Sequence, residues 1–179
     1  MDYTEKMVSV DEKYRGRIVY VHVDQVQLHD GRLGRREIVE HSGGVTVIPV
    51  DDDGMVYCVR QYRYAVGEHV LETPAGKLND GEEPLHCAVR ELGEETGFTA
   101  DNMIFLGGFY PSPGYCKEKL YIYLATGLHK GQAHLDEGEF LDVETYPLDT
   151  LVDMAMNNEL TDAKTIIAVL KAKCYLEGK

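Results

Sequence analysis

The sequence predicts one α/β domain, with a mixed sheet between helices, preceded by a β-hairpin extension. Segments with the two-residue period of strands interleave with segments of helical period, without the strict alternation of a parallel β-α-β fold. The chain has 179 residues, 44% hydrophobic and 27% charged, which suits one domain with a full core. We assign residues 1–43 to the extension and residues 44–179 to the main domain.

The first predicted strands form two pairs. Residues 18–28 alternate and are rich in β-branched side chains, and the pattern resumes at 35–40 after a turn, which predicts a hairpin. Residues 44–50 and 55–62 predict a second strand pair around the turn at 51–54.

Later segments continue the mixed pattern. Residues 70–73 lead into the segment at 74–76, and further strands are predicted at residues 104–109, 120–125 and 140–143. Residues 149–157 and 162–175 have helical periodicity, and Thr161 or Asp162 is expected to cap the second of these helices.

A helix is also predicted after Gly81. Asp80 offers a capping oxygen, Pro84 suits a first turn, and Gly97 can adopt the left-handed conformation that ends a helix. Four apolar residues recur with helical period and predict a buried stripe: Leu85, Ala88, Val89 and Leu92. Glu91 and Glu95 flank this stripe, and Glu94 lies farther round toward solvent.

Three carboxylates therefore crowd one side of this helix. Like charges at such spacing cost about 0.2 to 0.5 kcal/mol per pair unless a positive charge compensates them. A divalent cation is the expected compensator, and Mg²⁺ prefers oxygen ligands of this kind. The simpler interpretation is an acidic amphipathic helix with a solvated charged face.

The segment from Gly76 to Phe98 carries a longer pattern: Gly, five residues, Glu82, seven residues, then Arg90-Glu91-Leu92-Gly93-Glu94-Glu95-Thr96-Gly97-Phe98. This pattern resembles the Nudix box at every fixed position. The resemblance implies a Nudix-type α/β/α sandwich and a metal site that holds the pyrophosphate of a nucleoside diphosphate derivative. Carried over by position, the metal ligands are Glu91, Glu95 and the carbonyl of Ala75, with Glu94 close by and Arg90 anchoring the glutamates.

Outside the box, the chain resembles the ADP-ribose pyrophosphatase subgroup. The matching segments are Arg35 to His41, Arg60-Gln61-Tyr62-Arg63 with Glu72-Thr73-Pro74-Ala75-Gly76, Pro111-Ser112-Pro113-Gly114, and Asp136-Glu137-Gly138-Glu139. The last is an acidic loop in which Glu137 aligns with the catalytic base and Glu139 with a further metal ligand. The order of these two roles stays open, with Asp136 in reserve.

The same resemblance implies a set of substrate-binding residues. They are Arg35, Arg36, Arg63, Lys77, Ser112, Pro113, Gly114 and Glu118. A planar guanidinium suits bidentate contact with phosphate, so Arg63 is preferred over Arg60 as the pyrophosphate clamp. Plainer alternatives are a surface charge at Arg63, an inert turn around Ser112 and a solvated charge at Glu118.

These features together predict a Mg²⁺-dependent hydrolase, with Mn²⁺ as a substitute, that cleaves ADP-ribose to AMP and ribose 5-phosphate. Hydrolysis of another nucleotide sugar, such as GDP-mannose, and a non-catalytic ADP-ribose-binding module remain as alternatives. The net charge of −13 argues against nucleic acid or an anionic membrane as partner. No apolar run is long enough to span a membrane and no signal-like run begins the chain, so we expect a cytoplasmic protein. The subgroup resemblance implies a homodimer.

Overall fold

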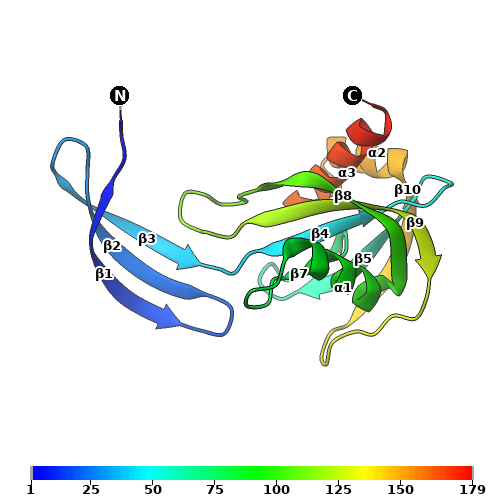
Figure 1. The fold of residues 1–179 in the computed structure, drawn as a ribbon, viewed down its shortest axis with the longest axis horizontal. Coiled ribbons are helices and arrows are strands. Elements are labelled where there is room, and N and C mark those ends of the chain that lie inside the picture. Colours follow the sequence, from blue (N-terminus) through cyan, green and yellow to red (C-terminus); the bar gives the residue numbers. More distant parts are fainter. Residues whose placement is uncertain (1, 179) are drawn as a thin grey trace. The chain divides into compact units, whose positions relative to one another are not determined.

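The protein, seen in a computed structural model that describes residues 2–178, forms two compact units (Figure 1). The first contains the described residues up to Gly43 together with Tyr110–Lys119, and the second contains the rest of the described chain. The predicted extension ends at residue 43, whereas this unit also includes a loop from the middle of the chain. Two backbone hydrogen bonds fix that loop: Val39 donates to the Tyr115 carbonyl (2.8 Å), and Lys117 donates to the Val39 carbonyl (2.9 Å).

The first unit is built on an antiparallel sheet in the order β1-β2-β3. Its strands are β1 (Lys6–Arg15), β2 (Tyr20–Gln27) and β3 (Leu33–Glu40). The predicted hairpin of β2 and β3 is confirmed, but β1 was not predicted. Every residue of β1 is exposed, so the strand has no buried face that could leave an alternating pattern in the sequence.

The second unit contains two sheets. One is antiparallel, in the order β10-β5-β6, and the other has the order β7-β4-β9-β8, in which β4 and β9 run parallel and the remaining pairs antiparallel. The strands are β4 (Gly44–Pro49), β5 (Met55–Arg63), β6 (Glu68–Glu72), β7 (Ala75–Lys77), β8 (Phe98–Phe109), β9 (Leu120–Lys130) and β10 (Leu141–Pro147). The helices are α1 (Pro84–Thr96), α2 (Leu148–Met156) and α3 (Ala163–Leu176).

The predicted pairing of β4 with β5 is wrong. The turn between them forms, and Gly54 donates to the Asp51 carbonyl. Beyond an isolated bridge between Val50 and Val56, however, the two strands separate and belong to different sheets. The cause is the burial of β4 at every position. A strand buried on both faces belongs in the middle of a sheet, and β4 lies there between β7 and β9.

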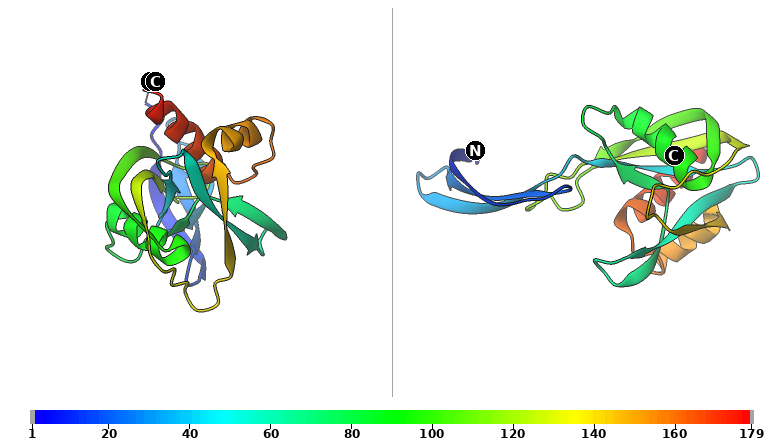
Figure 2. Two further views of the ribbon diagram at one scale, coloured as in Figure 1. Left: turned by 90° about the vertical axis from the view of Figure 1, so that its right-hand side faces the viewer. Right: turned by 90° about the horizontal axis from the view of Figure 1, so that it is seen from below.

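Helices cover both faces of the mixed sheet (Figure 2). On β4, Val45 and Val47 pack in one apolar cluster with α1, whereas Ile48 packs in the other with α2 and α3. On β9 the same alternation sends Tyr123 toward α1 and Leu124 toward α2 and α3. This is the expected α/β/α sandwich.

The helix α1 lies where the box predicts it, but its ends and faces differ in detail. Its N-cap is Glu83, without a side-chain capping bond, so Asp80 is not the cap; Pro84 and left-handed Gly97 have their predicted positions. Leu85 and Val89 are 42% and 49% exposed, contrary to the predicted stripe. The buried face consists instead of Cys87, Ala88, Glu91, Leu92, Glu95 and Thr96. The helix is therefore turned so that two of its carboxylates point inward.

The two C-terminal helices occur within two residues of their predicted bounds. Asp162 caps α3, because its Oδ2 accepts from the Thr165 backbone N–H at 3.0 Å. None of the helices in the described part of the chain is long and apolar enough to cross a membrane.

Candidate active site

Glu95 is the most deeply buried carboxylate of the box. It is 1% exposed, and its Oε2 accepts a hydrogen bond from the backbone N–H of Ala75 at 3.1 Å. The other oxygen, Oε1, is buried and has no hydrogen-bond partner within residues 2–178. A buried polar atom without a partner lowers stability by about 1 to 3 kcal/mol, so this oxygen is a candidate for binding a ligand.

Glu91 lies against strand β7 at Gly76. A Cβ on residue 76 would lie 1.7 Å from Glu91 Oε1, so only glycine leaves room for this carboxylate. The same oxygen accepts from Arg90 Nη1 at 2.7 Å. Gly76 thus serves as a cradle for the Glu91 side chain, which explains why a glycine begins the box.

Replacing Gly76 with alanine is expected to displace the Glu91 carboxylate and to weaken Mg²⁺ binding at least tenfold. The atoms in the way belong to the end of a flexible side chain, so the fold should survive. Metal affinity can be measured by calorimetric titration, and stability by thermal unfolding. Gly93→Ala is the matched control, since a Cβ there meets only the Phe98 carbonyl oxygen at 3.9 Å. Equal Mg²⁺ affinity of G76A and wild type would contradict the cradle.

Arg90 is bound to three glutamates. Its Nε donates to Glu82 at 2.9 Å, and its Nη1 donates to Glu91 at 2.7 Å and to Glu94 at 2.8 Å. The hydrogen bond from Arg90 is the main cause that lowers the pKa of Glu82 to about 2. Arg90 therefore has the anchoring contacts expected from the sequence, and it joins the loop before α1 to the helix.

The buried carboxylates of α1 oppose one another electrostatically. Burial raises the pKa of Glu95 to about 8 against the Ala75 hydrogen bond, and the charges of Glu91 and Glu139 add to the rise. Burial also raises the pKa of Glu91. Among the described residues, no three His, Cys, Asp or Glu side chains form a group arranged to hold a metal ion. The partnerless oxygen and the mutual repulsion fit a divalent metal with oxygen ligands.

The acidic loop between β9 and β10 is attached to the C-terminal end of α1. The backbone of His134 donates to the Glu94 carbonyl at 3.0 Å, and Gly131 donates to the Gly97 carbonyl at 2.7 Å. Glu139 is half-buried, and its charge reaches both Glu91 and Glu95. Glu137 is exposed. The structure therefore brings Glu139 into the electrostatic field of the box carboxylates.

Replacing Gly97 with alanine is expected to destabilise the protein by about 2 kcal/mol or more and to loosen the acidic loop. Its φ of +74° costs a non-glycine residue about 1 to 2 kcal/mol, and a Cβ would lie 2.7 Å from the backbone nitrogen of Ala133. Urea unfolding measures the loss, with Gly93→Ala on the same helix as control. A difference from wild type below about 0.5 kcal/mol would contradict both parts of this argument.

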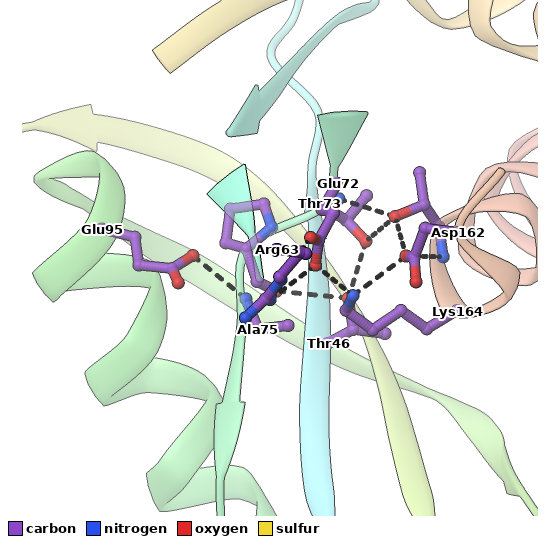
Figure 3. A network of polar contacts seen from close by, with 10 residues as sticks. Thr46, Arg63, Glu72, Thr73, Ala75, Glu95, Asp162 and Lys164 are labelled. Carbon is purple, nitrogen blue, oxygen red and sulfur yellow. Dashed lines mark hydrogen bonds and ion pairs between the residues drawn. The ribbon is translucent and has the colours of Figure 1, made fainter. Parts of the chain in front are cut away.

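The two arginines of β5 make different contacts. Arg60 is held by Glu144, with Nε donating at 2.5 Å and Nη2 at 3.1 Å. Arg63 is held by Glu72 through Nε at 2.6 Å and Nη2 at 2.7 Å (Figure 3). The charge of Glu95 is among the causes that raise the pKa of Arg63, so Arg63 lies within electrostatic reach of the box.

Lys164 and the side chain of Glu72 have no role in the site that the sequence predicts. Lys164 Nζ donates to Glu72 Oε2 and, at 3.0 Å, to Asp162 Oδ2. Thr165 Oγ1 accepts from the backbone N–H of Thr73 at 2.8 Å, two residues before Ala75. These contacts join the start of α3 to the strand that leads into the box. The acid in the Glu72-to-Gly76 motif could have marked Glu72 as a candidate site residue. Nothing in the sequence, however, pairs Glu72 with Lys164, which lies 92 positions farther along the chain.

The remaining substrate-binding candidates take no part in the contacts between the start of α3 and the strand that leads into the box. Lys77 follows Gly76, and its carbonyl accepts from Arg90 Nη2 at 3.4 Å. Six others belong to the first unit: Arg35, Arg36, Ser112, Pro113, Gly114 and Glu118.

Within that first unit, the candidate side chains have local partners. Arg36 Nε donates to the Glu5 carboxylate at 2.9 Å, and Arg36 Nη2 donates to the other oxygen of the same carboxylate. Glu118 lies 3.6 Å from Nδ1 of His41, an atom that accepts from the Gly43 N–H at 3.0 Å. The Ser112 carbonyl accepts from the backbone of Cys116 at 2.9 Å, which makes this loop a tight turn.

The model of the NUDIX domain matches residues 40–169. Over 93% of its length the chain is 40% identical to a methanol dehydrogenase activator of Bacillus methanolicus (91% of that protein), and over 92% it is 38% identical to an ADP-ribose pyrophosphatase of Bacillus subtilis strain 168 (90% of that protein). A crystal structure of an ADP compounds hydrolase superposes with a TM-score of 0.85 at 24% identity, covering 97% of this chain and 95% of that one. With the complete box folded as a buried carboxylate site, the chain belongs to the Nudix hydrolase family.

Proposed function

We propose that the protein hydrolyses the pyrophosphate bond of ADP-ribose to AMP and ribose 5-phosphate with the help of Mg²⁺. The observation that carries this proposal is the partnerless Oε1 of buried Glu95, next to Glu91 and the backbone of Ala75. Similarity to an ADP-ribose pyrophosphatase over nearly the whole chain supports the substrate.

In this proposal the residues of the second unit perform the reaction. Glu91, Glu95, Glu139 and the Ala75 carbonyl would hold the divalent cation, which neutralises charge on the diphosphate when bound. Glu137 accepts the proton of the attacking water, which adds its oxygen to one phosphorus as the bond to the bridging oxygen breaks. Arg63 binds and orients the diphosphate. Arg90 anchors Glu91 and Glu94 on the helix, and the backbone carbonyl of Glu94 holds the acidic loop at His134.

A screen of nucleoside diphosphate derivatives tests the proposal. With Mg²⁺, ADP-ribose should give equimolar AMP and ribose 5-phosphate by chromatography, and an excess of EDTA should stop the reaction. GDP-mannose, the substrate of the main alternative function, belongs in the same screen. If GMP is released from GDP-mannose faster than AMP is released from ADP-ribose, GDP-mannose is the preferred substrate. Tight binding of ADP-ribose without AMP release would instead indicate a binding module.

The 40% identity to a methanol dehydrogenase activator favours a second candidate, activation of such a dehydrogenase. Adding the protein to a methanol dehydrogenase and following the rate of methanol oxidation tests it. Because the carboxylate site is complete, we expect any activation to depend on hydrolysis and to be lost in Glu95→Gln. Full activation by that variant would indicate a non-catalytic contact.

The first unit is proposed to form a homodimer and to contribute to substrate binding. The exposed apolar residues of its edge strand β1, among them Met7, Val8 and Tyr14, support association with a second copy. Arg35 and Arg36 would then lie near the adenine, and the loop with Ser112, Pro113, Gly114 and Glu118 near the sugar; Lys77 would contact phosphate. Light scattering after size exclusion should give about twice the 20.1 kDa of the chain. A monomer at assay concentration would end this part of the proposal.

A further inference from the structure

Glu72 is a buried carboxylate shared by two cations. It is 1% exposed, and it accepts from Arg63 and from Lys164, whose side chain is itself 13% exposed (Figure 3). Burial alone raises the pKa of Glu72, but the hydrogen bonds and charges of Arg63 and Lys164 bring it below the usual value. Glu72 is therefore ionised, and one negative charge faces two positive ones.

The neighbouring Asp162 is a second carboxylate of this cluster, because Lys164 Nζ also donates to its Oδ2 at 3.0 Å. Its Oδ2 accepts from the backbone N–H of Thr165 at 3.0 Å and from Thr165 Oγ1 at 2.6 Å. These bonds make it the N-cap of α3, where the partial positive charge of the helix terminus offsets a carboxylate. Arg63 and Lys164 thus balance the two carboxylates Glu72 and Asp162, and the helix terminus adds a partial positive charge.

Arg63 is held so that part of its guanidinium stays available. Nε and Nη2 face Glu72, and the side chain is 43% exposed. A guanidinium has five N–H donors, and this bidentate contact uses two of them. Arg63, Glu72, Asp162 and Lys164 line a pocket of about 300 Å³. An oriented and partly free arginine can bind phosphate, provided that its partner carboxylate does not cancel its charge.

We propose that Lys164 is a positioning residue for the diphosphate-binding Arg63. As a second cation on Glu72, Lys164 lets that carboxylate orient Arg63 without cancelling the electrostatic attraction of Arg63 for the diphosphate. The inference rests on the proposed function and deepens it. Without Lys164, the single cation Arg63 is left with two carboxylates, Glu72 and Asp162, and a dianionic diphosphate gains little from approaching such a group.

Two substitutions and two controls test the role of Lys164. Lys164→Met should raise KM for ADP-ribose about tenfold with kcat within threefold of wild type. Lys164→Gln keeps a hydrogen-bond donor without the charge and should behave in the same way, whereas Lys164→Arg should restore KM to within threefold. Lys171→Met removes an exposed lysine of the same helix and should change nothing. Thermal unfolding identifies any variant that fails to fold.

Binding gives a readout that is independent of turnover. The affinity for the α,β-methylene analogue of ADP-ribose with Mg²⁺, measured by calorimetry, should fall about tenfold in K164M and K164Q. A wild-type KM and affinity in folded K164Q would overturn the role of Lys164 while leaving the proposed hydrolysis intact. A wild-type protein that binds the analogue but does not hydrolyse ADP-ribose overturns the hydrolysis, and the binding series still decides about Lys164. No binding by wild type overturns both.

Discussion

Replacing Glu95 with glutamine is expected to abolish hydrolysis and yet to stabilise the metal-free protein. The amide has nearly the shape of the carboxyl group and can still accept from Ala75 N–H, so the packing of α1 against β7 is retained. It carries no charge with which to hold a divalent cation. Because bound metal contributes several kcal/mol of charge stabilisation in such reactions, kcat/KM should fall by about 10³ or more.

The gain in stability follows from the raised pKa of Glu95. Burial, and then the charges of Glu91 and Glu139, raise that pKa to about 8, from the ordinary value of 4.5 in the unfolded chain. Between these values the native state binds more protons than the unfolded state, so stability falls as pH rises from about 4.5 to 8 and is level above that. Near pH 7 the cost of the ionisable group is on the order of 3 kcal/mol, and Glu95→Gln removes it.

Urea unfolding in EDTA at pH 5, 6, 7 and 8 measures this dependence. The difference in unfolding free energy between E95Q and wild type should grow with pH, and Mg²⁺ should stabilise wild type but not E95Q. Glu159→Gln, at an exposed position outside the site, is the control for the loss of a charge. If E95Q were less stable than wild type at pH 7 without metal, the carboxylate would have an internal partner and the argument for a metal site would fail.

The parts of the site that the sequence predicts correctly depend on local chemistry. A left-handed residue at the end of α1 requires glycine, and Pro84 is tolerated only at the first turn, so the bounds of the helix follow from neighbouring residues. The contacts of Arg90 with Glu91 and Glu94 follow from helical spacing. Each of these features spans about one or two helical turns.

Features that depend on distant partners were not predictable in this way. The apolar residues Leu85 and Val89 are exposed because α1 faces the sheet with Glu91 and Glu95, an orientation that its own apolar pattern does not favour. Contact with β7, where Gly76 makes room and Ala75 donates a hydrogen bond, accommodates the two carboxylates in this orientation. A functional site thus overrides the local pattern, as expected where binding and stability conflict.

The pairing of strands shows the same limit. The turn at Asp51 to Gly54 predicts a reversal of the chain, and the reversal occurs, but the partner of β4 is decided by the burial of its two faces. Likewise, Glu72 and Lys164 meet only because α3 packs against the sheet near the end of β6. The sequence contains the residues of that network but no local signal that joins them.

Substitutions in the acidic loop should separate the two roles that the sequence leaves open. Glu137→Gln is expected to lower kcat by about 10² to 10⁴, the usual range for loss of a general base, with Mg²⁺ affinity within threefold of wild type. Glu139→Gln is expected to weaken Mg²⁺ binding, because the charge of Glu139 already reaches Glu91 and Glu95 in the folded protein. Calorimetry with Mn²⁺ and kcat at saturating Mg²⁺ measure the two effects separately, and Asp136→Asn tests the reserve candidate.

The pH dependence of kcat distinguishes a missing base from a disturbed loop. A variant without its base relies on hydroxide, so the activity left in E137Q should rise steadily with pH, whereas wild type should level off once the base is ionised. A merely displaced loop would lower the rate without altering the shape of the profile. Because Glu91, Glu95 and Glu139 interact, the wild-type profile will report macroscopic pKa values of the set and not of one residue. If E137Q lost Mn²⁺ binding while E139Q lost only kcat, the exposed Glu137 would be the ligand and the half-buried Glu139 the base.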